Sequence, residues 1–267
     1  MTAVPARVRA AFALRGEPVR LPGGVSGVVR YGDVVVKPVT DVPEAEWVQS
    51  TLATLPQPAD LRWATPVATV DGGFVADGWI GHEYLPGIRP ARPDWELVLE
   101  AGRRFHRATA EVTTPAAMLA ARTHRWARGE RHAFDEEAVP LSAEAAALDR
   151  DLAARCRPDA RRTQVVHVDL LTNVFVDPHG VPVVLDIAPG ARSPRYSVAV
   201  AIGDALLWEE APAAVVDLLG DRDDAHALLA RAARFRMATE QIALTAGSRS
   251  AHGGDLTPYR RLLTLMS

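Results

Sequence analysis

The chain has 267 residues, 48% of them hydrophobic and 24% charged, which is the composition of a globular protein with a sizeable core. Its net charge of -3 gives no reason to expect nucleic acid as a partner. The first twenty residues predict no secretory signal, and no apolar run is long enough to predict a membrane span. The single cysteine, Cys156, excludes an internal disulfide and a cysteine-built metal site. We therefore expect a cytoplasmic enzyme or binding protein.

The first part of the chain predicts a small β-rich lobe. A short helix is expected within residues 1–20, followed by two strands in "GVSGVVRYGDVVVKPV" with a turn at Tyr31–Asp33. A helix should run from Asp41, its cap, to about Leu55, because Glu44 follows Asp41 by three residues. Two more strands, "ATPVATV" and "GFVADGWIGHEYL", complete this lobe.

The remainder is mostly helical. Residues 86–94 hold three prolines and a glycine, which indicates a boundary between two parts. Periodic apolar residues predict helices, which we place at 95–110, within 115–136, at 143–156 and from about 197 to the end. The strands expected here are "VVHVDLLTNVFVD" and "VPVVLD". The sequence thus predicts an α+β, two-lobed fold, with a β-rich lobe over 1–86 and a helical lobe carrying one hairpin over 87–267.

Polar residues interrupt or end the apolar strands of this predicted hairpin: His167, Asp169, Asn173 and Asp186. A buried polar group costs stability unless it is paired. Carboxylate and amide oxygens form a donor set that suits Mg²⁺, which phosphates usually help to bind. The residues therefore predict a cation site near a hydroxyl-binding carboxylate. The alternative is that they only cap loops and turns.

The register of the hairpin decides whether two of these residues share a face. If Asp-Pro-His-Gly forms a four-residue turn, Val176 pairs with Val181, and Asn173 lies opposite Val184. Asp186 would then lie on the same face as Asn173, about 7–8 Å away along the diagonal. One cation could bridge the two side chains in that register.

These residues resemble the catalytic loop of small-molecule kinases of the aminoglycoside phosphotransferase and choline kinase group, which share the two-lobed protein-kinase fold. His167-Val-Asp169 followed by Asn173 resembles the loop itself, and Asp186 of "VVLDIAP" resembles the metal-binding aspartate. The resemblance implies that Asp169 is catalytic, that His167 packs the loop, and that Asn173 and Asp186 bind Mg²⁺. Asn173 follows Asp169 by four residues, whereas the commoner loop has five.

Lys37 is the only lysine among the 30 basic residues, and it ends the apolar strand "VVVK". The resemblance implies that Lys37 binds the α- and β-phosphates of ATP, with Glu44 as its ion-pair partner and Glu46 as the alternative. A strand-end lysine that only reaches solvent is the structural alternative.

The resemblance also places the nucleotide. Gly24, Ser26 and Gly27 are expected in a loop over its phosphates, and Glu83, Tyr84 and Leu85 are expected to bind the adenine through main-chain groups. The pattern G-x-x-x-x-G-K-[ST] is missing from the sequence, so a P-loop is not supported.

Three weaker signals concern the second lobe. The resemblance implies that Asp204 supports the catalytic loop from beneath. Residues 204–224 are rich in carboxylates, which suits a cationic acceptor, although solvated helix faces and caps are the simpler explanation. Arg192 and Arg195 follow Asp186 and could meet phosphates or an acidic acceptor.

The main hypothesis is an ATP- and Mg²⁺-dependent phosphotransferase acting on a hydroxyl of a small molecule of the aminoglycoside, aminosugar or amino-alcohol type. The alternative is a nucleotide-binding pseudokinase that serves as a regulatory or scaffold module. A third hypothesis takes His167, Asp169 and Asp186 as ligands of a metal-dependent hydrolase. A nucleotide and a small hydroxyl compound are the expected partners, with neither nucleic acid nor membrane.

Overall fold

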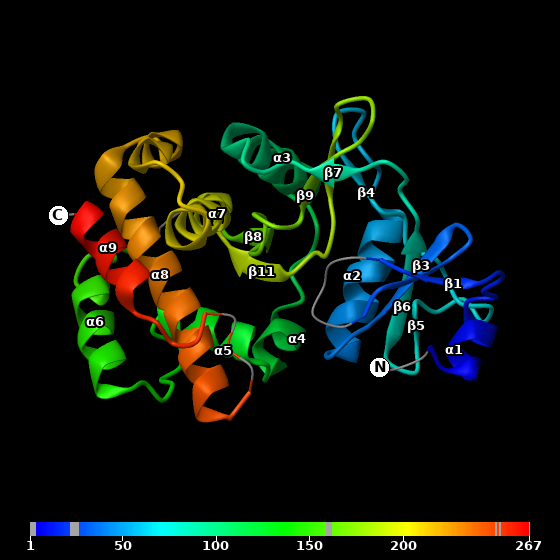
Figure 1. Ribbon diagram of the computed structural model, residues 1–267, viewed down its shortest axis with the longest axis horizontal. Helices are drawn as coiled ribbons and strands as arrows, with labels where there is room; N and C mark the ends of the chain where they lie inside the picture. Colours follow the sequence, from blue (N-terminus) through cyan, green and yellow to red (C-terminus); the bar gives the residue numbers. More distant parts are fainter. Residues whose placement is uncertain (1–3, 22–26, 159–161, 249, 251, 267) are drawn as a thin grey trace. The chain divides into compact units, whose positions relative to one another are not determined.

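A computed structural model of the protein describes residues 4–21, 27–158, 162–248, 250 and 252–266. The chain forms two compact units (Figure 1). The first comprises residues 1–90 and 174–187, and the second comprises 91–173 and 188–267. The mixed α+β content predicted from the sequence is confirmed.

The first unit contains two short helices and most of the strands. Its elements are α1 (Ala6–Ala11), β1 (Pro18–Arg20), β2 (Val29–Tyr31), β3 (Val34–Pro38), α2 (Val42–Thr54), β4 (Arg62–Trp63), β5 (Val75–Ala76), β6 (Trp79–Glu83), β7 (Arg89–Pro90), β9 (Val174–Val176) and β10 (Pro182–Val184). Five strands form an antiparallel sheet in the order β1-β2-β3-β6-β5. Helices α1 and α2 both contact β5. Val8, Phe12, Val36 and Trp79 belong to the buried cluster that joins α1 to this sheet.

Local signals in the first unit are confirmed. Tyr31 pairs with Val34, so the turn between β2 and β3 consists of the two residues Gly32 and Asp33. Gly32 has a φ of 55°, which glycine adopts without strain. Asp41 caps α2 by accepting a hydrogen bond from the Glu44 backbone N–H at 3.0 Å.

The hairpin register predicted from the sequence is wrong by one residue. Val176 pairs with Pro182, and Val184 pairs with Val174. The Asp177 side chain accepts hydrogen bonds from the backbone N–H groups of His179 and Val181, at 2.8 and 2.9 Å, which tightens the turn. The ladder ends before Asn173 and Asp186, so strand alternation does not place them on one face.

The hairpin also differs from the expected division of the chain, which assigned it to the second part. Strand β10 pairs in parallel with β4, and β9 pairs with β7, which gives a four-stranded sheet in the order β4-β10-β9-β7. Because these partners come from residues before 91, the hairpin groups with the first unit.

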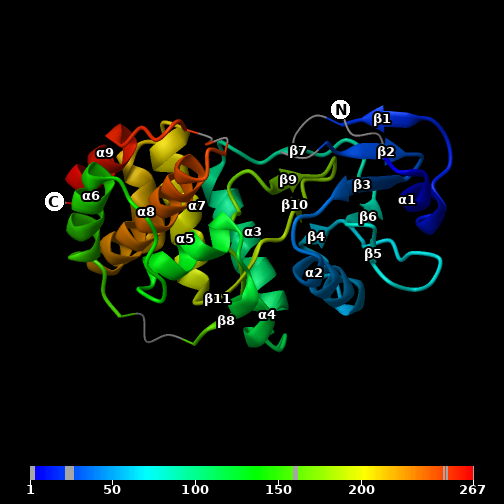
Figure 2. The ribbon, with the colours of Figure 1, turned by 90° about the horizontal axis from the view of Figure 1, so that it is seen from below.

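The second unit is mainly helical. Its elements are α3 (Trp95–Ala108), α4 (Ala116–Ala121), α5 (Arg125–Ala133), α6 (Ala143–Ala153), β8 (Gln164–His167), β11 (Pro189–Arg192), α7 (Pro194–Trp208), the 3-10 helix η1 (Ala213–Leu219), α8 (Arg222–Thr245) and α9 (Thr257–Leu265). Helix α8 contacts α5, α6, α7 and α9, and Figure 2 shows it among them. Gly129 permits the close approach of α5 to α8, because an added Cβ would lie 3.0 Å from the Phe235 carbonyl oxygen.

Two features of this unit differ from the sequence prediction. The apolar stretch beginning at Val165 forms two strands in separate sheets, and its first part, β8, pairs with β11. Strand β11 was not predicted.

Among the described residues, no helix is both long enough and apolar enough to cross a membrane.

Candidate functional site

His167 ends β8 and organises the loop that follows it. Its Nδ1 accepts hydrogen bonds from the backbone N–H groups of Asp169, at 3.2 Å, and Ala188, at 3.3 Å. A ring nitrogen that accepts hydrogen bonds carries no proton, so these bonds assign the neutral form with the proton on Nε2. The imidazole is fully buried. These contacts suit the loop-packing role better than that of a base or a metal ligand.

Asp169 and Asn173 are joined across the loop. The Asn173 side-chain N–H donates to the Asp169 main-chain oxygen at 2.7 Å and to Oδ2 of its carboxylate at 3.1 Å. The Asn173 backbone N–H also donates to the Leu170 carbonyl at 2.9 Å. The four-residue spacing is thus accommodated by a closed turn, in which Asn173 fixes one edge of the Asp169 carboxylate.

Arg236 holds the other carboxylate oxygen, and the sequence did not identify it. Its Nη2 donates to Asp169 Oδ1 at 2.6 Å and to Asp204 Oδ2 at 2.5 Å, while its Nε donates to Asp204 Oδ1 at 2.8 Å. Asp204 lies on α7 and Arg236 on α8, and both are buried. Burial opposes the charge of Arg236, but the two carboxylates raise its pKa above the ordinary value.

Ser197 supports the loop in addition to Asp204. The Ser197 hydroxyl, in the first turns of α7, donates to the carbonyl oxygen of His167. Asp204 is linked to the loop through Arg236, which contacts both Asp204 and Asp169. Burial raises the pKa of the Asp204 carboxyl to about 6, with Arg236 opposing the shift, so the group is ionised at neutral pH.

The sequence contained one signal for Arg236. Three arginines, Arg231, Arg234 and Arg236, lie in an otherwise apolar part of α8, and all three are buried. Buried arginines require partners. The abundance of arginine elsewhere in this chain conceals that signal.

Lys37 and Asp186 form the candidate site of the first unit. The Lys37 ammonium makes an ion pair with the Asp186 carboxylate, and the Lys37 side chain is 19% exposed. Burial lowers the Lys37 pKa to about 8, so the side chain remains charged at neutral pH. Asp186 has a φ of 50°, a left-handed conformation that aspartate tolerates better than most residues.

The two glutamates proposed as partners of Lys37 are placed differently. Glu46 accepts a hydrogen bond from the Phe74 backbone N–H at 3.2 Å. Glu44 lies in the first turn of α2 and is half-buried. The structure pairs Lys37 with Asp186, and an ion pair with Glu44 stays a prediction.

The residues expected to bind adenine lie at the end of β6, where Glu83 is its last residue and Tyr84 and Leu85 follow it. The Tyr84 backbone N–H donates to the Asp33 carbonyl at 2.7 Å, and the Arg30 guanidinium lies 3.8 Å from the centre of its ring. The Glu83 backbone N–H donates to the Thr65 carbonyl at 2.9 Å. Leu85 follows Tyr84 and is buried. Main-chain binding of adenine by residues 83–85 stays a prediction.

Only part of the expected phosphate-covering loop can be placed. Gly27 adopts a φ of 67°, which favours glycine. Gly24 and Ser26 lie outside the described residues. Their proposed contact with phosphates is therefore untested.

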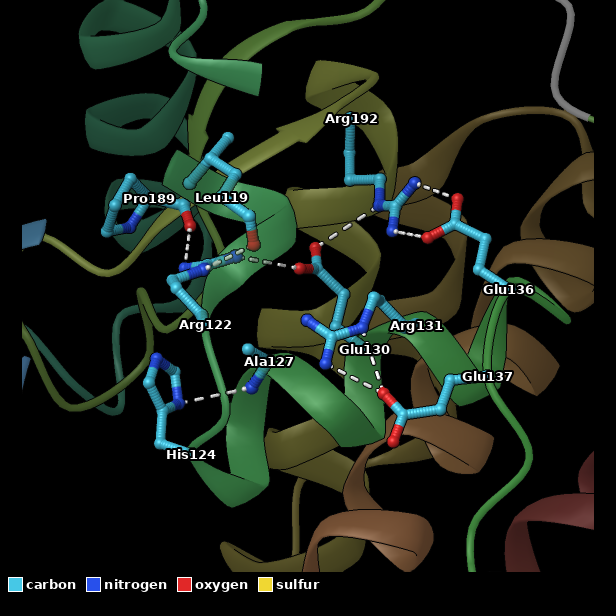
Figure 3. A network of polar contacts seen from close by, with 10 residues as sticks. All are labelled: Leu119, Arg122, His124, Ala127, Glu130, Arg131, Glu136, Glu137, Pro189 and Arg192. Carbon is cyan, nitrogen blue, oxygen red and sulfur yellow. Dashed lines mark hydrogen bonds and ion pairs between the residues drawn. The ribbon is translucent and has the colours of Figure 1, made fainter. Parts of the chain in front are cut away.

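A buried charge network supports the strands beside the candidate loop (Figure 3). Glu130 on α5 is buried and contacts Arg192 of β11 at 3.3 Å and Arg122 at 3.6 Å. Arg122 also donates to the carbonyl of Pro189 at 2.8 Å. An added Cβ on Gly190 would lie 2.9 Å from Glu130 Oε1, so glycine there permits the close approach. The network connects α5 with β11, which pairs with the strand that ends at His167.

Arg192 and Arg195 thus have structural partners within the second unit. Besides Glu130, Arg192 binds Glu136 at 2.8 Å, and its guanidinium lies 3.7 Å from the centre of the Phe134 ring. Arg195 binds Asp224 and the Leu219 carbonyl, each at 2.8 Å. These contacts give both arginines a role in packing, and binding of phosphate by either stays a prediction.

The chemistry of the two proposed metal ligands fits Mg²⁺. The Asn173 amide nitrogen is engaged with Asp169, so its oxygen is the atom left to ligate a cation. Asp186 offers a carboxylate whose side chain is 44% exposed. No group of three or more His, Cys, Asp or Glu suited to a metal occurs in the described part of the chain. The Asn173 and Asp186 side chains thus each offer oxygen, the donor atom that Mg²⁺ prefers in proteins.

The fold is that of the two-lobed, protein-kinase-like small-molecule kinases. Choline kinase LicA from Streptococcus pneumoniae is similar, with a TM-score of 0.57 and 13% identity over 95% of this chain and 94% of LicA. A structure of LicA in complex with AMP has a TM-score of 0.55 at 13% identity, with the same coverage. A choline/ethanolamine kinase family protein from Mesorhizobium loti has a TM-score of 0.50 at 16% identity, over 94% of this chain and 88% of that protein.

Neither a protein-family model nor a curated protein matches the sequence. At these identities the structural similarity shows the fold alone. The resemblance inferred from His167, Asp169, Asn173 and Asp186 is confirmed at that level.

Proposed function

We propose that the protein is an ATP- and Mg²⁺-dependent phosphotransferase that moves the γ-phosphate to a hydroxyl of a small molecule. The observation that carries the proposal is Asp169, whose carboxylate is held by Arg236 and Asn173 at the end of a buried strand in a kinase-like fold. Phosphoryl transfer depends mainly on positioning and charge neutralisation, so a firmly oriented carboxylate is the main requirement.

Each residue then has a role within that proposal. Asp169 accepts a hydrogen bond from the acceptor hydroxyl and later takes its proton. Lys37 binds the α- and β-phosphates, with Asn173 and Asp186 as ligands of Mg²⁺. Bound Mg²⁺ would supply neutralisation of the phosphate charge. LicA is described as a choline kinase and has been captured with AMP, which supports a nucleotide and an amino alcohol as the first ligands to test.

The first experiment is a thermal-shift measurement with ATP, with and without Mg²⁺. A ligand at about 100 times its Kd stabilises the folded state by about 2.7 kcal/mol. Phosphotransfer is then screened against amino alcohols, aminoglycosides, aminosugars and nucleosides. Asp169→Asn should reduce transfer to a small residual rate and retain the shift with Mg·ATP. Equal turnover by this variant would remove Asp169 from the catalytic role.

A nucleotide-binding module without transfer activity is the second candidate. Two observations favour this candidate. Lys37 and Asp186 neutralise each other, and the Asn173 side-chain nitrogen is engaged with Asp169. This candidate predicts a thermal shift with nucleotide and no product from any acceptor. The metal-dependent hydrolase has less support, because His167 Nδ1 already accepts two backbone hydrogen bonds.

A further inference from the structure

Arg236 is the one cation within hydrogen-bonding distance of the Asp169 carboxylate among the contacts that the structure describes. Its 2.6 Å bond to Oδ1 is charge-assisted, and such bonds are about twice as strong as neutral ones. Asn173 contributes the 3.1 Å bond to Oδ2. Each carboxylate oxygen has two lone pairs, so both oxygens retain one acceptor position for another group. The Asp169 side chain is 43% exposed, which leaves it accessible to such a group.

The Arg236 side chain is fixed from behind. Asp204 accepts from both Nε and Nη2, and this two-point contact sets the plane of the guanidinium. Arg236 and Asp204 are 6% and 3% exposed, so water competes little for these bonds. Asp204 lies on α7 and Arg236 on α8, and these two long helices contact each other. The orientation of Asp169 is therefore set by the packing of two helices outside the loop.

We propose that Arg236 is a positioning residue, which acts through Asp169 to hold its carboxylate in the orientation that meets the acceptor hydroxyl. This inference rests on the proposed phosphotransferase function. The guanidinium bond fixes the Oδ1 edge of the carboxylate, so Asp169 meets the acceptor hydroxyl in a set orientation. Orientation is what phosphoryl transfer through a loose transition state mainly requires of this group.

The test must separate positioning from stability. Arg236→Met alone would leave the buried Asp204 without its partner and could prevent folding. The double variant Arg236→Met/Asp204→Asn removes both buried charges together. A matched control is Arg234→Met/Asp149→Asn, which removes a second buried ion pair, the one between Arg234 of α8 and Asp149 of α6, joined by a 2.9 Å bond.

Turnover is measured with the best acceptor of the screen, or as hydrolysis of Mg·ATP by water. Loss of positioning should reduce kcat by about 100-fold in Arg236→Met/Asp204→Asn, with the KM for ATP changed less than about threefold. Arg236→Lys should recover part of kcat, because it restores the charge without the fork. The control pair should lower the melting temperature and leave kcat unchanged.

A second measurement uses Asp169→Asn as the background. If Arg236 acts through Asp169, the double substitution should cause little further loss of the residual turnover there, because the two effects are not additive. An equal loss in both backgrounds, or an unchanged kcat in the double variant, would overturn the inference and leave the proposed function intact. A wild-type protein with no turnover and no shift with Mg·ATP would overturn both.

Discussion

Lys37 on β3 and Asp186, two residues after β10, form an ion pair inside the first unit. In the proposed function these residues have separate ligands, phosphate for Lys37 and Mg²⁺ for Asp186. Each side chain must therefore exchange its partner when the nucleotide binds. Breaking this ion pair costs free energy in the ligand-free protein. ATP alone would give a new partner to Lys37 only, and Mg²⁺ alone to Asp186 only, whereas Mg·ATP would give a new partner to each residue.

This exchange predicts coupled binding of ATP and Mg²⁺. The Asp186→Asn variant should bind ATP without metal at least as tightly as the wild type, because Lys37 is released from its ion pair. Addition of Mg²⁺ should no longer increase the affinity of this variant for ATP. Lys37→Met should weaken binding of Mg·ATP by about tenfold or more, or about 1.4 kcal/mol. Calorimetric titrations with ATP in EDTA and in Mg²⁺ measure both effects. A wild-type response to Mg²⁺ in Asp186→Asn would contradict the role of Asp186.

The buried network of Figure 3 predicts a large stability effect at Glu130. Burial raises the pKa of the Glu130 carboxyl, and Arg192 and Arg122 oppose the shift. Glu130→Gln leaves these two arginines without their shared carboxylate. Breaking a buried ion pair costs about 3–5 kcal/mol, which urea denaturation would measure as a lower midpoint.

The matched control for Glu130 is Glu137→Gln on the same network. Glu137 pairs with Arg128 and Arg131, each at 2.7 Å, and its side chain is 25% exposed. More exposed pairs contribute about 0–1 kcal/mol. Similar losses in the two variants would show that burial does not set the importance of this network.

Stability should fall in acid partly because of His106. Its Nε2 accepts the His167 backbone N–H at 3.3 Å, and burial, with His167 adding to it, lowers the His106 pKa to about 3. The folded state therefore excludes a proton that the unfolded chain binds below about pH 6.5. The stabilisation is complete above that pH and is lost as the pH falls toward 3, by at most about 1.4 kcal/mol per pH unit.

His106→Gln tests this dependence because glutamine does not titrate. The difference in free energy of unfolding between wild type and variant should shrink by about 1.6 kcal/mol from pH 6.5 to pH 5. Urea titrations at several pH values provide the measurement. A difference that stays constant with pH would exclude His106 as a source of acid sensitivity.

Local chemistry explains which parts of the structure could be predicted from sequence. The Asp41 cap and the turn at Gly32 depend on residues within a few positions, and both were predicted correctly. The hairpin register failed because the Asp177 carboxylate accepts two backbone hydrogen bonds, a choice that the turn signature does not fix. Arg236 lies 67 residues from Asp169, so only the packing of α7 and α8 brings it to the loop.

Ser197 provides a final test of how the loop is supported. Its hydroxyl donates to the His167 carbonyl, two residues before Asp169, and is fully buried. Ser197→Ala leaves that carbonyl without this donor, which should cost about 1–3 kcal/mol of stability. Because the carbonyl adjoins the loop, kcat should fall as well.

Thr109→Val is the control, since Thr109 Oγ1 donates to the Val165 carbonyl at 3.0 Å, earlier in the same strand. Both variants remove a buried hydroxyl that supports β8, so their melting temperatures should fall by comparable amounts. Only Ser197→Ala should also lose turnover at temperatures where both proteins are folded. Equal activities would mean that β8 transmits no displacement to Asp169, and that Ser197 contributes to folding alone.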